Sequence, residues 1–144
     1  MKTNETGFTL IELLLVVTVV VSLSILVLPS MVRTIQNIET KQFFDKLDSD
    51  VLYAQNSALT QSDNNIQVRF YDDQYHIIAS TKVLKRENYP KHLNLRNSKT
   101  LITYSSTGTI KNPGTFVIYD DNTNKKHEIT FPFGKGRYYV KTIE

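Results

Sequence analysis

The feature that most constrains this chain is an uninterrupted apolar run near its N-terminus. The 21 residues from Phe8 to Leu28 contain one charged side chain, Glu12. As an α-helix they would extend about 31 Å, which matches the hydrocarbon thickness of a bilayer. The run has no polar face, so such a helix must be surrounded by lipid or by other apolar helices. We therefore expect residues 8–28 to form a transmembrane helix.

Two simpler explanations of the run are a secretory signal peptide and a plain membrane anchor. The run is longer than the apolar region of a typical signal peptide, and no small-x-small cleavage site follows it before Pro29. Neither explanation accounts for Glu12, because a carboxylate inside lipid costs about 3 kcal/mol or more. We therefore expect a cation to meet this carboxylate.

The residues just before the run suggest a source for that cation. If the bond after Gly7 is cut, Phe8 becomes the N-terminus and carries a new amine at the membrane edge. This amine lies about one helical turn from Glu12, so it can pair with Glu12 of the same chain or of a neighbouring chain. The spacing therefore predicts an ion pair that forms only after cleavage.

The string Glu5-Thr6-Gly7-Phe8-Thr9-Leu10-Ile11-Glu12 closely resembles the class III signal of type IV pilins and pseudopilins. In that superfamily a short polar leader ends in Gly, and Phe-Thr-Leu-Ile-Glu opens a long apolar helix. The resemblance implies that residues 1–7 are a leader, that a prepilin peptidase cuts after Gly7, and that Phe8 is then methylated. It also implies that Glu12 neutralises the N-terminus of a neighbouring subunit during assembly.

A second helical segment is expected between residues 29 and 60. Pro29 should break or bend the helix where the lipid-embedded part ends. An apolar stripe at helical spacing then resumes, with charged residues between its members. The stripe consists of Ile35, Ile38, Phe44, Leu47, Val51, Ala54 and Ala58. We interpret this amphipathic segment as a packing surface for the rest of the chain.

From Ile66 onward the apolar period changes from helical spacing to two, which is typical of strands. The expected strands are residues 66–71, 75–80, 101–105, 115–119, 127–131 and 137–142, with turn residues between them. We interpret Lys82 to Lys99 as a long loop with one short strand near Leu93 and Leu95. The expected fold class is α+β, with a long N-terminal helix packed on an antiparallel β-sheet head formed by residues 61–144.

Three glycine-containing strings of the head, residues 105–110, 114–118 and 136–140, are similar to the β-rich heads of minor pseudopilins. Among these the chain is most similar to the ComGD-like minor pilins of the Gram-positive competence pilus. The resemblance implies a pilin-like fold and a filament subunit that serves uptake of external DNA during transformation. The implied partners are the prepilin peptidase, the major and other minor pilins, and membrane lipid before assembly.

That resemblance also implies a location: a single membrane span with the head outside, followed by a pilus on the cell surface. Two other functions remain open at this point. One is a pseudopilin of a protein secretion machine of the same architecture. The other is an uncleaved, membrane-anchored surface binding module.

The composition gives no support for an enzyme. The chain has no cysteine, and His76, His92 and His127 match no metal-binding spacing. The run that begins at Asp120 and includes Asn122 and Asn124 starts like a calcium loop. However, Lys125 stands where glycine is needed, and Phe131 stands where a bidentate Glu belongs. We expect a polar turn there, with no metal and no cofactor.

The net charge of +3 is concentrated in the head. Residues 82–99 carry six basic side chains and one acidic one, and Lys85, Arg86, Lys91 and Arg96 are the candidates for contact with DNA phosphates. The alternative is a solvated basic surface that keeps the head soluble, since charge clusters alone are weak evidence.

Overall fold

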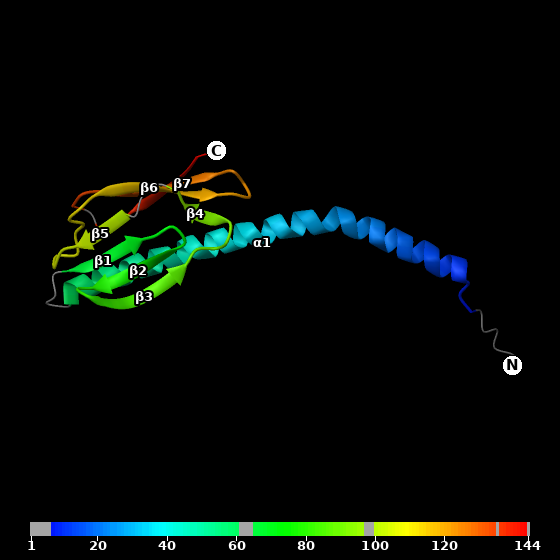
Figure 1. Ribbon diagram of the computed structural model, residues 1–144, viewed down its shortest axis with the longest axis horizontal. Helices are drawn as coiled ribbons and strands as arrows, with labels where there is room; N and C mark the ends of the chain where they lie inside the picture. The colour runs from blue at the N-terminus through cyan, green and yellow to red at the C-terminus, as the bar shows by residue number, and fades with distance from the viewer. Residues whose placement is uncertain (1–6, 61–64, 97–99, 135, 144) are drawn as a thin grey trace. The chain divides into compact units, whose positions relative to one another are not determined.

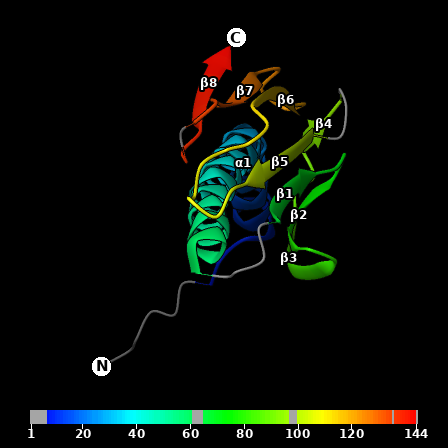
Figure 2. The same ribbon diagram turned by 90° about the vertical axis from the view of Figure 1, so that its left-hand side faces the viewer.

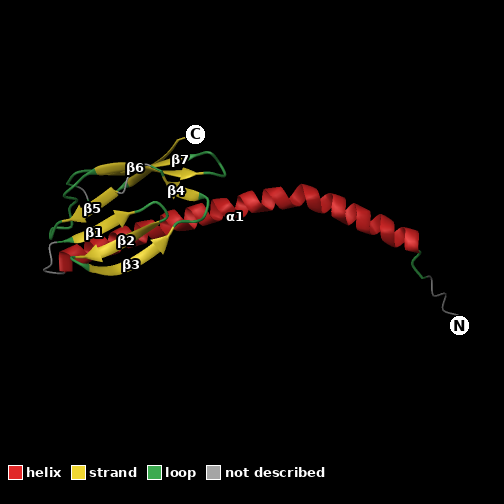
Figure 3. Cartoon of the chain, in the orientation of Figure 1, coloured by secondary structure: helices red, strands yellow, loops and turns green. Residues whose placement is uncertain are grey.

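The computed structural model describes residues 7–60, 65–96, 100–134 and 136–143 (Figure 1). The chain divides into two units, Met1–Asn37 and Ile38–Glu144, and one helix, α1 (Leu10–Thr60), contributes to both. All eight strands lie in the second unit, which we call the head (Figure 3). The α+β class predicted from the sequence is confirmed in this coarse form.

The helix α1 begins at a defined cap. The Thr9 hydroxyl accepts a hydrogen bond from the Glu12 backbone N–H at 3.3 Å, and the Thr9 carbonyl accepts one from the Leu13 N–H at 3.1 Å. Thr9 therefore satisfies backbone donors of the first turn, which have no partner inside the helix. As a result, α1 begins at Leu10, two residues after the expected start at Phe8.

The backbone of α1 remains helical through Pro29, so Pro29 does not break the helix, and the alternative of a bend there stays a prediction. Proline inside a helix removes one backbone hydrogen bond and crowds the carbonyl four residues earlier.

The stripe predicted on the second part of α1 is confirmed where it enters the head. The buried members are Phe43, Leu47, Val51, Ala54 and Ala58. Phe43 takes the place predicted for Phe44, and Ile35 and Ile38 are half exposed. The six residues from Ile38 to Phe44 turn the helix by about 600°, so these two side chains cannot share one face.

The head contains two four-stranded antiparallel sheets. The first has the order β3-β2-β1-β5 and the second the order β4-β6-β7-β8, and Figure 2 shows both sheets beside α1. Their bounds are β1 (Ile66–Phe70), β2 (Gln74–Ala79), β3 (Lys82–Asn88), β4 (Leu93–Leu95), β5 (Thr100–Tyr104), β6 (Gly114–Asp120), β7 (Lys126–Phe131) and β8 (Tyr139–Ile143).

Aromatic side chains from the two sheets meet in one core. The Phe70 ring of β1 lies with its centroid 4.3 Å from that of Phe116 on β6 and 5.9 Å from that of Phe131 on β7. All three side chains are buried. Contacts between rings at these distances add about 1 kcal/mol each to the burial of their area. The two sheets and α1 therefore share a single hydrophobic core.

The loop predicted over residues 82–99 is wrong in its first half, where β3 forms, and the short strand predicted near Leu93 and Leu95 is confirmed as β4. The alternation of β3 is hard to see in the sequence because charged residues occupy its helix-facing positions. Lys85 forms an ion pair with Asp50, and Glu87 lies 2.8 Å from Lys46.

Asp50 is the most deeply buried charge among these pairs, with 2% of its surface exposed. One of its oxygens accepts a hydrogen bond from the Tyr75 hydroxyl at 2.7 Å, and the other faces the Lys85 ammonium. Burial, together with the hydrogen bond to Asp50, raises the pKa of Tyr75, so the hydroxyl stays protonated and donates. This network fixes β2 and β3 against α1.

A β-bulge decides which side chains of β3 face the helix. The register between β2 and β3 shifts between Ile77 and Ile78. In the unshifted register His76 would lie opposite Lys85, whereas in the structure it lies opposite Arg86. One extra residue on one strand exchanges the two faces beyond the bulge. Lys85 therefore faces Asp50, and Arg86 lies on the opposite side of the sheet.

The free edge of β5 is occupied by a side chain. The Asn112 amide donates to the Leu101 carbonyl, and its oxygen accepts a hydrogen bond from the Thr103 N–H at 2.6 Å. These are the backbone groups that a further strand would bind. Asn112 thus takes the place of a neighbouring strand at this edge.

Two glycines of the head pack against α1 at Gln55. The Gln55 amide donates to the Gly108 carbonyl at 2.9 Å, and Gly108 has a φ of 70°. A Cβ on Gly136 would lie 1.7 Å from Gln55 Nε2 and 2.9 Å from the Gly108 carbonyl oxygen. Glycine is therefore required at position 136, because a larger residue would collide with both groups.

We expect Gly136→Ala to lower the free energy of unfolding of the head by about 2 kcal/mol, because the added methyl displaces Gln55 and breaks its hydrogen bond. Thermal unfolding of the full chain in detergent measures the change. Gly114→Ala is the matched control, since its Cβ would meet its nearest atoms at an ordinary 3.5 Å. Equal stability of the two variants would contradict this account.

Candidate assembly helix and charged surfaces of the head

The first unit contains the part of α1 with the membrane-like composition. Among the described residues, α1 is the one helix long and apolar enough to cross a membrane, and none of that stretch is buried in the structure. Its hydroxyl groups are satisfied within the helix: Thr18, Ser22 and Ser24 each donate to a carbonyl about one turn earlier, at 2.7–2.8 Å. These hydroxyls therefore need no outside partner in an apolar surrounding.

Gly7 and Phe8 lie immediately before this helix. A Cβ on Gly7 would meet nothing within 4 Å, and Phe8 is 85% exposed. Because Thr9 caps the helix, a cut between Gly7 and Phe8 leaves the cap and all of α1 intact. Of the leader predicted over residues 1–7, Gly7 alone lies within the described residues.

Glu12 has a structural role that the sequence reasoning missed. Thr9 and Glu12 stand at the first and fourth positions of a Thr-x-x-Glu capping box, and the Glu12 N–H bonds to the Thr9 hydroxyl. An acidic side chain in the first turn also interacts favourably with the helix dipole. The signal was present in the sequence as the spacing of these two residues. Glu12 is thus placed at the helix start by the local sequence.

The four basic residues predicted to contact DNA do not form one surface. Lys85 faces α1 and pairs with Asp50, and Arg96 pairs with Asp121. Arg86 and Lys91 are exposed. Lys85 is therefore not part of a surface shared by the four residues, and Arg96 is held in a local ion pair.

His76 lies in β2, whereas His92 and His127 both lie near Asp120. His92 is buried, with Nε2 at 2.8 Å from the Thr40 hydroxyl, and His127 Nδ1 lies 3.1 Å from the Thr142 hydroxyl. Burial lowers the pKa of His127. Within the described ranges, no three His, Asp or Glu side chains are grouped so that they could hold a metal ion.

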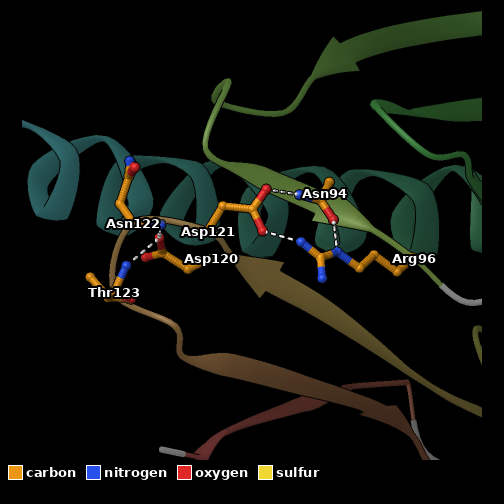
Figure 4. A network of polar contacts seen from close by, with 6 residues as sticks. All are labelled: Asn94, Arg96, Asp120, Asp121, Asn122 and Thr123. Atoms are coloured by element: carbon orange, nitrogen blue, oxygen red, sulfur yellow. Dashed lines mark hydrogen bonds and ion pairs between the residues drawn. The ribbon is translucent and has the colours of Figure 1, made fainter.

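The turn after β6 contains the residues of the incomplete calcium pattern (Figure 4). Asp120 is buried, and its Oδ1 accepts hydrogen bonds from the backbone N–H groups of Asn122 and Thr123 at 3.0 and 3.1 Å. The adjacent Asp121 accepts from Asn94 at 2.5 Å and pairs with Arg96. The Asp120 oxygen thus closes a polar turn of its own chain.

Comparisons of the chain with protein-family models, with curated proteins and with solved structures find no match. The structure itself supports an α+β protein with an apolar N-terminal helix of membrane-spanning length and an antiparallel β-sheet region. A more specific function is therefore inferred from the local geometry described above.

We expect Asp120→Ala to destabilise the head by about 2 kcal/mol at pH 7, because two backbone donors lose their acceptor. Burial opposes ionisation of Asp120, but hydrogen bonds from Thr123 and Asn122 outweigh it and hold the pKa below its usual value. Because the pKa of Asp120 is lower in the folded than in the unfolded state, its ionised carboxylate stabilises the fold at pH values above the unfolded pKa of about 3.9. This contribution to the free energy of unfolding is lost as the pH falls through the pKa of the folded state.

The difference in the free energy of unfolding between wild type and Asp120→Ala should therefore become smaller below about pH 4. Thermal unfolding at pH 7 and pH 3 measures both effects. Asp121→Ala is the control, because its ion pair with Arg96 is exposed and such pairs contribute less than about 1 kcal/mol. A difference for Asp120→Ala that is the same at both pH values would contradict the role of the ionised carboxylate.

Proposed function

We propose that this protein is a minor pilin, or pseudopilin, of a competence type IV pilus, assembled through its N-terminal helix and required for uptake of external DNA. The observation that supports it best is the order of three features: an open Gly7–Phe8 bond, a cap at Thr9, and Glu12 in the first turn of a helix whose apolar stretch is not buried in the structure. A plain anchor does not need the glycine.

In this proposal a prepilin peptidase cuts after Gly7 and the new N-terminal residue, Phe8, is methylated. The amine then lies four residues before Glu12, just outside the helix. In the membrane Glu12 lies near the end of the span, where a charge is less costly than at the centre. In the filament Glu12 of one subunit pairs with the amine of the next, so each added subunit brings one cation to one buried acid.

The separate core of the head is consistent with such a change of surroundings. The buried apolar residues of the structure all lie between Phe43 and Phe131, within the second unit. None of these residues belongs to the part of the apolar run whose side chains the structure describes, residues 8–25. The head can therefore stay folded outside the cell while that run exchanges membrane lipid for the helices of the major and other minor pilins.

Gly7→Leu should leave the precursor uncut and held in the membrane, because the larger side chain obstructs the peptidase at the cleaved bond. Mass spectrometry of the N-terminal peptide in cells that contain the peptidase measures the cut and any added methyl. Ser24→Leu is the control, since it enlarges a residue inside the span and should be processed normally. Normal processing of Gly7→Leu would count against the proposal, and so would a wild-type protein that keeps its first seven residues.

Glu12→Gln should reduce incorporation into filaments by about tenfold, which corresponds to about 1.4 kcal/mol of lost pairing. Glutamine preserves the capping box, so the helix start is unchanged while the charge is removed. Quantitative blotting of sheared filaments against membranes measures the ratio. Glu12→Asp retains the charge and should assemble better than Glu12→Gln. Equal assembly of both variants with the wild type would mean that the carboxylate has no pairing role.

A further inference from the structure

A row of basic side chains crosses the first sheet of the head on the side away from α1. Strand register places Arg69 of β1 opposite His76 of β2, and His76 opposite Arg86 of β3. Val68 and Phe70, the sequence neighbours of Arg69, are buried in the core, so Arg69 faces outward. The bulge in the β2–β3 pair brings Arg86 rather than Lys85 into this row.

The two arginines of this row do not belong to the ion pairs of the head. Three cations of the head have acidic partners: Lys46 pairs with Glu87, Lys85 with Asp50 and Arg96 with Asp121. Within the residues that the structure describes, Arg69 and Arg86 form no ion pair, and Arg69 donates to the neutral Gln67 at 3.2 Å. Arg69 and Arg86 lie on either side of β2, about 10 Å apart, so an anion placed between them would interact favourably with both charges.

The histidine between the two arginines has an unsatisfied atom. His76 Nε2 is buried and has no hydrogen-bond partner in the described part of the chain. Burial lowers the pKa of His76, the positive charges of Arg86 and Arg69 lower it further, and Asp73 in the β1–β2 turn acts in the opposite direction. The Tyr71 ring lies 4.7 Å from the imidazole. The negative charge of a phosphate in the row would favour the protonated form of His76.

We propose that Arg69, His76 and Arg86 bind the phosphate backbone of DNA across the outer face of the first sheet. Neighbouring strands lie about 4.8 Å apart, so the row extends about 10 Å, which equals the rise of about three base pairs along the axis of a DNA duplex. Arginine is well suited to phosphate because its guanidinium makes paired hydrogen bonds. The choice of DNA over another phosphate polymer rests on the proposed function, whereas the row itself does not.

This assignment replaces the basic loop as the contact surface. Lys85 and Arg96 are engaged with acidic side chains, and Lys91 lies outside the row. The site therefore predicts different sensitive residues from those that the sequence suggested, with Arg86 as the one shared position.

The test uses the full chain in phosphatidylcholine nanodiscs and a fluorescent DNA duplex, with binding followed by anisotropy as NaCl is increased. Loss of two phosphate contacts in Arg69→Gln/Arg86→Gln should weaken binding at least tenfold at low salt and flatten the slope of log K against log salt by about 1.8. Lys91→Gln/Lys141→Gln removes the same charge from exposed sites elsewhere and should retain the wild-type slope.

Three outcomes would overturn the site: no binding by the wild type, equal losses in the two double variants, or equally tight binding of polyaspartate. A pH series adds a test of the histidine. Wild-type binding should strengthen from pH 8 to pH 6 because phosphate favours protonated His76, and His76→Gln should lose this dependence. A pH dependence that survives in His76→Gln would exclude the histidine from the row and contradict the site as drawn.

The same variants in cells separate this inference from the proposed function. Arg69→Gln/Arg86→Gln should still be cut after Gly7 and enter filaments, but should transform at least tenfold less often. Unchanged transformation would contradict the DNA site and leave the filament role untouched. A wild-type protein that is not cut contradicts the filament role, whereas the binding measurement in nanodiscs would still stand.

Discussion

The head depends on one face of α1. Leu47, Val51, Ala54 and Ala58 are all buried, and they give both four-stranded sheets an apolar surface to cover. An antiparallel sheet of this size needs one face packed on other apolar groups to be stable. The small alanines let the strands approach the helix closely, while the rings of Phe70, Phe116 and Phe131 fill the space between the sheets. Toward its N-terminus the same helix continues as an apolar segment that is not buried in the structure.

Much of this architecture could be predicted from residue patterns because its causes are local. The apolar run, the stripe from Leu47 to Ala58 and the alternation of β1 each depend on periodicity within one element. The strand β3 could not be predicted, because Lys85 and Glu87 occupy positions where an apolar residue is expected. Their partners, Asp50 and Lys46, lie on a helix 35 to 41 residues earlier, and such pairs are not visible in a single sequence.

The two candidate sites also differ in how far they could be predicted from the sequence. The Gly7–Glu12 segment is contiguous, so its motif could be recognised directly, and the capping box was equally available in the spacing of Thr9 and Glu12. The outward row could not be found, because it depends on the register of three strands. A shift of one residue at Ile77 and Ile78 decides whether Lys85 or Arg86 lies beside His76. A count of basic residues therefore indicates a charged region, but the strand register decides which of its side chains share one face.

The amide of Asn112 has a consequence for how copies of this protein can associate. An unpaired strand edge is a template for a strand of another molecule, and many identical copies at high local density would make uncontrolled fibre growth through such edges a hazard. By binding the Leu101 carbonyl and the Thr103 N–H, Asn112 blocks this part of the edge of β5. Heads at high local concentration are therefore protected from strand pairing with one another through that edge.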